Sequence, residues 1–175
     1  MTDFALKYDW KLRSDPYPVD EERLVDSPLL LATLERFMSQ YKGIFRVPVE
    51  GGELEFWFDF DLMQAWDQLP TWLGHLASRP RSEAALEMAS QGTMIALVAK
   101  RDGERITLRA QSILPEPNLP SYLKPITVPA SAFLGEWVKF LTAVLEALAE
   151  FEPRLLTDSD WLAYRAAIMD VMRHE

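Results

Sequence analysis

Two aspartates, Asp59 and Asp61, are the residues of this chain whose type and spacing best fit a chemical role. Hard divalent cations bind carboxylate oxygens, and alternate residues of a strand share one face with Cα atoms about 6.6–6.8 Å apart. The pair could hold an ion if both side chains bent inward and if Glu55 or Asp67 joined them. Two carboxylates could also serve as acid and base in glycoside hydrolysis, but no second acidic motif accompanies them. We favour the simpler interpretation, a solvated strand face, and expect no metal site.

Other catalytic groups are scarce. The chain has no Cys, which excludes thiolate nucleophiles and Cys-based metal sites, and its two His are His75 and His174. The glycines form no Gly-x-Ser-x-Gly motif, phosphate loop or dinucleotide fingerprint. We interpret His75 as a surface or half-buried helical residue and His174 as part of a frayed end. The sequence therefore predicts a protein that is not an enzyme and uses no cofactor.

The two aspartates belong to a segment, residues 53–62, whose two faces differ sharply. With the two-residue period of a strand, one face is wholly apolar: Leu54, Phe56, Phe58, Phe60 and Leu62. The other face carries Glu53, Glu55, Trp57, Asp59 and Asp61. A large indole among charges is typical of an interface anchor, so we expect this face to bind a protein. The alternative is a covering helix that makes Trp57 a core residue, but the predicted C-terminal helices lack the row of Lys or Arg that such a helix would need.

Glycine-containing turns predict the hairpins that would position this segment. Gly51-Gly52 separates candidate strands 44–49 and 53–62, and Asp102-Gly103 separates candidate strands 94–99 and 105–113. A short strand at 126–129 completes the set. The segment 1–26 is polar, acidic and mostly irregular, although alternating apolar residues allow a short edge strand there.

Apolar residues at helical spacing predict helices over 28–43, 63–77, 82–89, 131–151 and 158–173. Ser27, Ser82, Ser131 and either Asp158 or Ser159 are the expected N-caps, Gly43 is the expected stop of the first helix, and Pro70 interrupts the second. In the last helix we expect an inward face made of Trp161, Leu162, Ala166, Ile168, Met169 and Met172. The pattern predicts a single α+β domain over 1–175, with an antiparallel sheet built from hairpins and packed against a long C-terminal helix pair and shorter helices.

Composition narrows the class of partner. The chain has 175 residues, 49% of them hydrophobic, and a net charge of −9. Negative charge repels nucleic-acid phosphates and anionic lipids, so we expect neither nucleic acid nor membrane as a partner, and we expect a basic protein instead. No secretory signal or membrane span is apparent, which favours a cytoplasmic protein.

Three features follow one another along the chain: a hairpin leading into Phe58-Asp59-Phe60-Asp61-Leu62, a second hairpin across Asp102-Gly103, and Val128-Pro129-Ala130-Ser131-Ala132-Phe133 at the start of a long helix. Over about residues 44–150, this order, together with size and acidity, resembles the small acidic immunity proteins of bacterial toxin systems. The resemblance implies tight binding to a cognate toxin, often through an acidic surface laid against basic residues. It makes the face around Trp57 the first candidate contact, and the proline-rich loop 114–125, with Asn118 and Tyr122, the second.

Two other classes remain open. The chain could be an adaptor or structural subunit that assembles with itself through its C-terminal helices, so that it would be a homodimer rather than a monomer. It could also be an enzyme that uses Asp59, Asp61 and Asp67 with a divalent metal.

Overall fold

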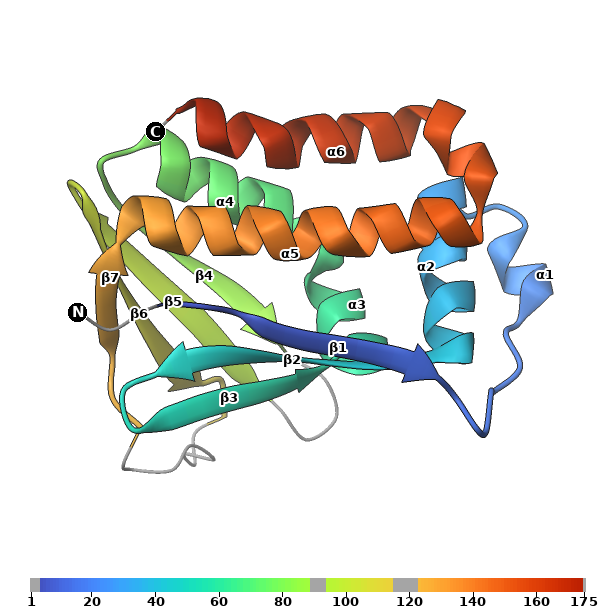
Figure 1. The fold of residues 1–175 in the computed structure, drawn as a ribbon, viewed down its shortest axis with the longest axis horizontal. Helices are drawn as coiled ribbons and strands as arrows, with labels where there is room; N and C mark the ends of the chain where they lie inside the picture. Colours follow the sequence, from blue (N-terminus) through green and yellow to red (C-terminus); the bar gives the residue numbers. More distant parts are fainter. Residues whose placement is uncertain (1–3, 89–93, 115–122, 175) are drawn as a thin grey trace.

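Two antiparallel sheets and a set of helices form the computed structural model, which describes residues 4–88, 94–114 and 123–174 (Figure 1). The first sheet has the order β1-β2-β3, with bounds β1 (Lys7–Leu12), β2 (Tyr41–Val49) and β3 (Gly52–Trp57). The second has the order β4-β5-β6-β7, with bounds β4 (Arg81–Met88), β5 (Ile95–Asp102), β6 (Arg105–Ser112) and β7 (Ile126–Pro129). The predicted α+β class is confirmed, with two sheets in place of one.

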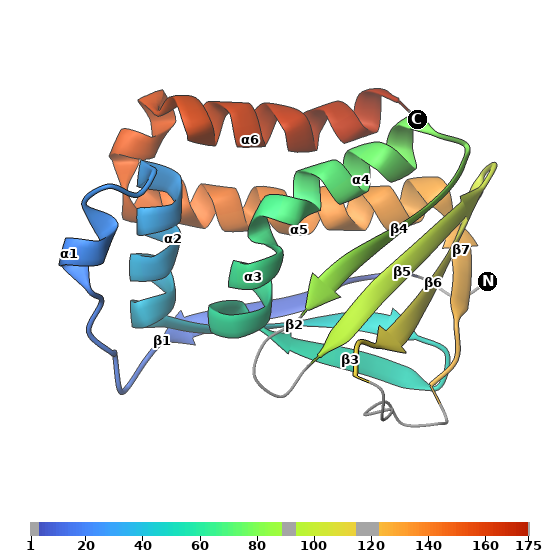
Figure 2. The same cartoon turned by 180° about the vertical axis from the view of Figure 1, so that it is seen from behind.

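The α-helices are α1 (Glu21–Leu24), α2 (Leu29–Gln40), α3 (Met63–Ala65), α4 (Leu69–Ser78), α5 (Ala130–Phe151) and α6 (Ser159–Asp170). A π-helical turn covers Phe58–Leu62, and 3₁₀ turns cover Trp66–Gln68, Pro153–Thr157 and Val171–Arg173. In both ribbon views α5 lies between α6 and the three-stranded sheet, while α4 runs beside the second sheet (Figures 1 and 2). The long helix α5 is therefore the central element, and α6 is an outer one.

The predicted glycine turn between β2 and β3 is confirmed. Val49 pairs with Gly52, and Gly51 has a φ of 95°, a left-handed conformation that favours glycine. The possible N-terminal strand is also present, because β1 pairs antiparallel with β2 along the edge of the sheet. The segment 1–26 is accordingly not wholly irregular: it contains β1 and α1.

The second hairpin and the short strand after it are likewise present. Gly103 turns the chain with a φ of 60°, and β7 pairs with β6. A two-bond bridge between Glu50 and Lys124, with N···O distances of 3.0 and 2.9 Å, joins the turn of the first hairpin to the residues before β7. The two sheets are thus linked at one corner by backbone hydrogen bonds.

The predicted helix over 82–89 is wrong, because these residues belong to strand β4. Glu, Ala, Leu and Met favour a helix locally, but eight consecutive cross-strand pairs with β5, from Arg81↔Asp102 to Met88↔Ile95, override that preference. The strand also buries Leu86 and Met88 toward the core on alternate positions. The alternate apolar positions Leu86 and Met88 are the sequence signal for this strand, although the helix propensity of the same residues is stronger.

The helix boundaries follow the predictions only in part. Asp158 caps α6 by accepting a hydrogen bond from the Trp161 N–H at 2.9 Å, as expected. In contrast, α2 and α5 begin directly after prolines without a side-chain cap, so Ser27 and Ser131 do not have that role. Gly43 does not end α2, which stops at Gln40; it lies inside β2.

A continuous hydrophobic cluster joins both sheets to α5. Its aromatic centre brings Phe45 of β2 to 5.1 Å from Phe140 and 6.2 Å from Trp137, both on α5, measured between ring centroids. No helix among the described residues is long and apolar enough to cross a membrane.

Candidate protein-binding surfaces

Strand β3 places Glu53, Glu55 and Trp57 on the outer face of the three-stranded sheet, as their spacing predicts. Basic residues of the neighbouring strands lie beside them. Lys7 of β1 contacts Glu53 at 2.5 Å, and Arg46 of β2 contacts Glu55 at 2.7 Å. Both carboxylates are therefore paired within the sheet.

Trp57 is also partly covered by a cation from the adjacent strand. The Nζ of Lys42 lies 4.4 Å from the centre of the Trp57 ring, a cation–π contact. The register of the three strands places seven charged side chains on this outer face. The basic ones are Lys7, Lys11, Lys42 and Arg46, and the acidic ones are Asp9, Glu53 and Glu55. The face is consequently mixed in charge, not the acidic surface that β3 indicates when read alone.

Asp59 and Asp61 do not lie on that face, because the strand ends at Trp57 and the chain turns into a π-helical segment. The buried carboxylate of Asp61 accepts a hydrogen bond from the Trp57 N–H at 2.8 Å, which fixes the turn. Phe58 packs against the backbone of Gly43, where a β-carbon would lie 2.5 Å from its ring. The turn also leaves Phe60 exposed, so the apolar face predicted for 53–62 is interrupted there.

Asp59 forms a largely buried ion pair with Arg13, whose Nε also donates to the Met38 carbonyl at 3.0 Å. Their side chains are only 8% and 10% exposed. Arg13 further lies over the ring of Tyr17, and burial, followed by the charge of Asp59, raises the pKa of the Tyr17 hydroxyl. This group ties the segment after β1 to α2 and holds one carboxylate oxygen of Asp59 against Arg13, whereas the other, Oδ1, is buried without a hydrogen-bond partner in the described structure.

These contacts remove the carboxylate pair on which the metal alternative depended. Asp59 and Asp61 point to different partners, and Glu55 is bound to Arg46. Within 4–88, 94–114 and 123–174, no group of three or more His, Asp or Glu side chains is placed to hold a metal ion. The second predicted contact, Asn118 and Tyr122, lies outside the described residues.

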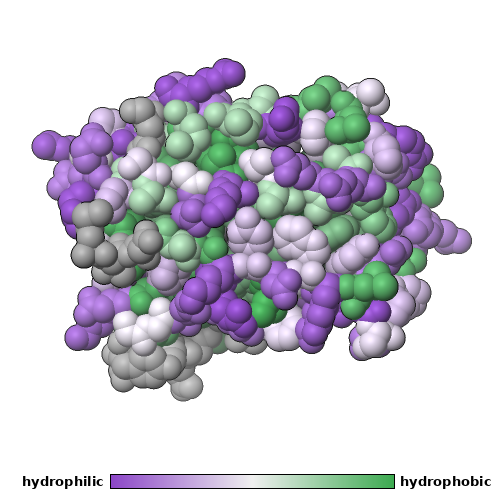
Figure 3. Space-filling model, in the orientation of Figure 1, coloured by the Kyte–Doolittle hydropathy of each residue, from purple (hydrophilic) through white to green (hydrophobic). Residues whose placement is uncertain are grey.

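A different candidate surface lies where α6 runs alongside α5 (Figure 1). A groove of about 550 Å³ is lined by residues of α5, of the 3₁₀ turn after it and of α6: Thr142, Leu145, Glu146, Ala149, Glu150, Leu156, Trp161, Leu162 and Arg165. Its walls are mainly apolar, and Figure 3 shows green side chains, interrupted by purple ones, along the band that α5 and α6 occupy in Figure 1.

Large apolar side chains are exposed in this groove, at Leu156 and Leu162, and farther along the C-terminal segment. Of the ten exposed large hydrophobic residues in the described ranges, four lie within 156–172: Leu156, Leu162, Met169 and Met172. The prediction that Leu162, Ala166, Met169 and Met172 face inward is therefore wrong. The buried face of α6 consists of Trp161 and Ile168, continued by Val171, because α6 is an outer helix whose apolar arc is wider than the surface that covers it.

The charges at the groove differ from those of the outer sheet face. Glu146 and Glu150 are exposed and form no ion pair with any described residue. Arg165 lies over the ring of Trp161, 5.6 Å from its centre. The i,i+4 spacing of the two glutamates on an apolar helix is the sequence signal for this surface, but a pattern that places the apolar residues of α6 in the core does not predict a groove there.

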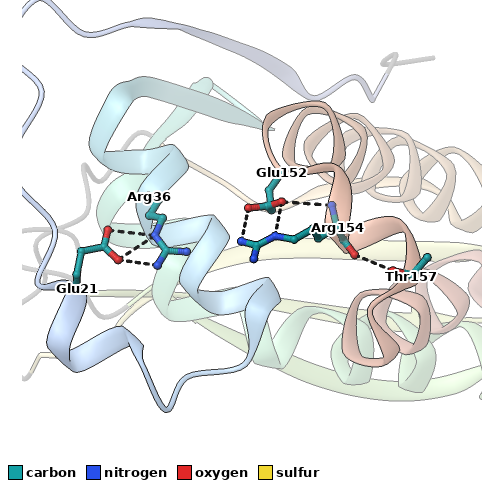
Figure 4. Close-up of polar contacts among 5 residues, drawn as sticks. All are labelled: Glu21, Arg36, Glu152, Arg154 and Thr157. Atoms are coloured by element: carbon teal, nitrogen blue, oxygen red, sulfur yellow. Dashed lines mark hydrogen bonds and ion pairs between the residues drawn. The ribbon is translucent and has the colours of Figure 1, made fainter.

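Two other carboxylates of this region, Glu21 and Glu152, form ion pairs. Figure 4 shows Glu21 facing Arg36 and Glu152 facing Arg154, with closest distances of 2.6 and 2.7 Å. Hydrogen bonds from Arg154 lower the pKa of Glu152 to about 2. Glu146 and Glu150, in contrast, line the groove and are open to an external cation, as is the exposed Asp160 beside Trp161.

Tyr164 holds α6 against the helices below it. Its hydroxyl donates to the Trp66 carbonyl at 2.9 Å, and the two rings stack at 4.6 Å. Burial of the hydroxyl, with a contribution from the charge of Asp67, raises the pKa of Tyr164 well above its ordinary value.

Comparisons of the chain with models of protein families, with curated proteins and with solved structures found no match.

Proposed function

We propose that this protein is a non-catalytic binding protein with a basic protein partner, and that it acts as an immunity protein by binding and neutralising a cognate bacterial toxin. The observation that carries the binding proposal is the exposure of Leu156 and Leu162 in the groove, beside two carboxylates, Glu146 and Glu150, that have no ion-pair partners in the described structure. Exposed apolar groups flanked by charge are typical of protein interfaces. The toxin-binding class is supported by the resemblance in size, acidity and element order.

The state of the acidic residues favours binding over catalysis. Asp59 and Asp61, the best candidates for chemistry, are held by Arg13 and by the Trp57 N–H. A group committed to a structural contact needs that contact broken before it can act as a base, a nucleophile or a ligand. These contacts count against the metal-dependent alternative.

Self-assembly through the C-terminal helices is the second candidate function, and the exposed apolar residues of α6 favour it specifically. Light scattering separates the two candidates. A monomer at micromolar concentration would contradict the homo-oligomeric form, and a dimer that Leu162→Asp dissociates would support it.

The proposed function is tested by capture from the native host with the tagged protein, followed by co-expression of the captured partner. We expect one basic protein in equimolar amount, toxic when expressed alone and harmless when co-expressed with this chain. Trp57→Ala and Leu162→Asp, run in parallel, distinguish the sheet face from the groove as the contact. Absence of any stoichiometric partner would contradict the proposal.

A further inference from the structure

We infer that the groove between α5 and α6 receives an amphipathic helix of the partner, with apolar side chains facing the groove and Lys or Arg side chains on its flank. This inference rests on the proposed function for the existence of a basic protein partner, and it adds the site and the form in which that partner is recognised.

The shape of the groove fits a helix. Its residues on α5 are Thr142, Leu145, Glu146, Ala149 and Glu150, which follow the i, i+3, i+4, i+7, i+8 spacing of one helical face. This stripe spans about 12 Å along the axis at 1.5 Å per residue. An amphipathic helix presents anchors at matching i, i+4 and i+7 positions over the same length.

The apolar part of the groove supplies the anchor site. Trp161 and Leu145 are buried, whereas Leu156 and Leu162 are 55% and 46% exposed. A docked apolar side chain would cover these leucines and remove their apolar surface from water, which favours binding.

The charged part of the groove selects a basic helix. Glu146 and Glu150 lie one turn apart on α5, and neither is paired with a cation of the described chain. Lys or Arg residues at i and i+4 of the docked helix would meet both carboxylates in charge-assisted hydrogen bonds. The cation already at the groove, Arg165, is directed to Trp161.

The same charges argue against a second copy as the occupant. A two-fold contact places the same surface on both subunits, so it would bring two pairs of carboxylates together with only one arginine from each. With a net charge of −9 on every chain, two copies also repel one another at longer range. A basic helix is complementary to this protein both at the groove carboxylates and in overall charge.

The test uses a fluorescein-labelled 18-residue helical peptide with Leu at the apolar positions and Lys on the flank. The matched peptide has every Lys replaced by Glu. Fluorescence anisotropy with the full-length protein should give saturable one-to-one binding of the Lys peptide only. Equal binding of both peptides, or no saturation with either, would overturn the inference.

Protein variants then place the site. Glu146→Lys/Glu150→Lys should weaken binding of the Lys peptide by about tenfold or more, because it replaces two attractive contacts with repulsive ones. Glu53→Lys/Glu55→Lys makes the same change in net charge on the sheet face and should weaken binding by no more than about threefold. Leu162→Asp should also weaken it by about tenfold through loss of the apolar contact. Equal losses in the two charge-reversed proteins would show that only the overall charge matters, which contradicts a site in the groove.

The natural partner separates failure of this inference from failure of the proposed function. If the captured partner is retained by Leu162→Asp and by Glu146→Lys/Glu150→Lys, the groove inference falls while the binding function stands. If neither the unmodified protein nor any variant captures a partner, the proposed function itself is contradicted. A dimer that is dissociated by the groove variants would assign the groove to a second copy and overturn the basic helix.

Discussion

Gly43 shows how one missing side chain permits the turn at the end of β3. The ring of Phe58 lies against its backbone, so a β-carbon at position 43 would sit 2.5 Å from that ring. We expect Gly43→Ala to lower the free energy of unfolding by about 1–3 kcal/mol through overpacking. Urea denaturation measures the change. Gly74→Ala is the matched control, because nothing lies within 4 Å of its β-carbon and helix α4 should gain about 0.5–1 kcal/mol.

The ion pair between Arg13 and Asp59 should contribute more to stability than the one between Arg46 and Glu55. The first pair has side chains 10% and 8% exposed, and the second 36% and 43%. Asp59→Asn leaves a buried arginine without its counter-charge, so we expect a loss of about 3 kcal/mol. Glu55→Gln should cost less than about 1 kcal/mol, because solvent screens an exposed pair. Similar losses for the two variants, measured by urea denaturation, would contradict the buried position of Asp59.

Tyr164 predicts a specific response to alkaline pH. Its pKa is raised in the folded protein, so above about pH 10 the unfolded chain loses a proton that the folded chain retains. The stabilisation is therefore complete below pH 10 and is lost as the pH rises further. Tyr164→Phe should cost about 1 kcal/mol at neutral pH, through the bond to the Trp66 carbonyl, and should make the decline above pH 10 shallower. The free energy of unfolding of each protein is measured between pH 9 and 11. An equal decline in the two proteins would contradict this role of Tyr164.

Helix α6 has one buried side and one exposed side. Ile168 is fully buried and Leu162 is 46% exposed, although both are aliphatic residues of the same helix. Ile168→Ala should lower the free energy of unfolding by about 2–4 kcal/mol through loss of core packing. Leu162→Ala should change it by less than about 1 kcal/mol. The opposite order in thermal or urea denaturation would restore the inward orientation of Leu162 and remove the exposed surface beside the groove.

The two misassigned segments, 58–62 and 82–89, have one physical cause. In each, the local pattern is satisfied by more than one structure, and contacts with distant residues decide between them. The bond from the Trp57 N–H to Asp61, with Phe58 against Gly43, ends one strand early. The ladder with β5 turns a run of helix-forming residues into β4.

At the scale of the whole molecule, the net charge of −9 should steer a basic partner. We expect the association rate constant with that partner to fall by about tenfold or more between low salt and 0.5 M salt, because screening shortens the range of the attraction. The dissociation rate should change much less, since it depends on contacts within the interface. Stopped-flow fluorescence or surface plasmon resonance measures both rates. An association rate that is independent of salt would exclude charge as the source of recognition.

The sequence by itself determined the α+β class, both hairpins with their Gly51 and Gly103 turns, and a cap of α6 at Asp158 or Ser159, because each depends on residues close together in the chain. It also placed Glu53, Glu55 and Trp57 on one face of β3. Only the tertiary structure decided what surrounds them: Lys7 and Arg46 arrive from neighbouring strands and neutralise that face. It likewise decided that α6 lies outermost, which leaves Leu162 beside the carboxylates of α5. Cross-strand register and helix burial depend on contacts between residues far apart in sequence, so local periodicity does not contain them.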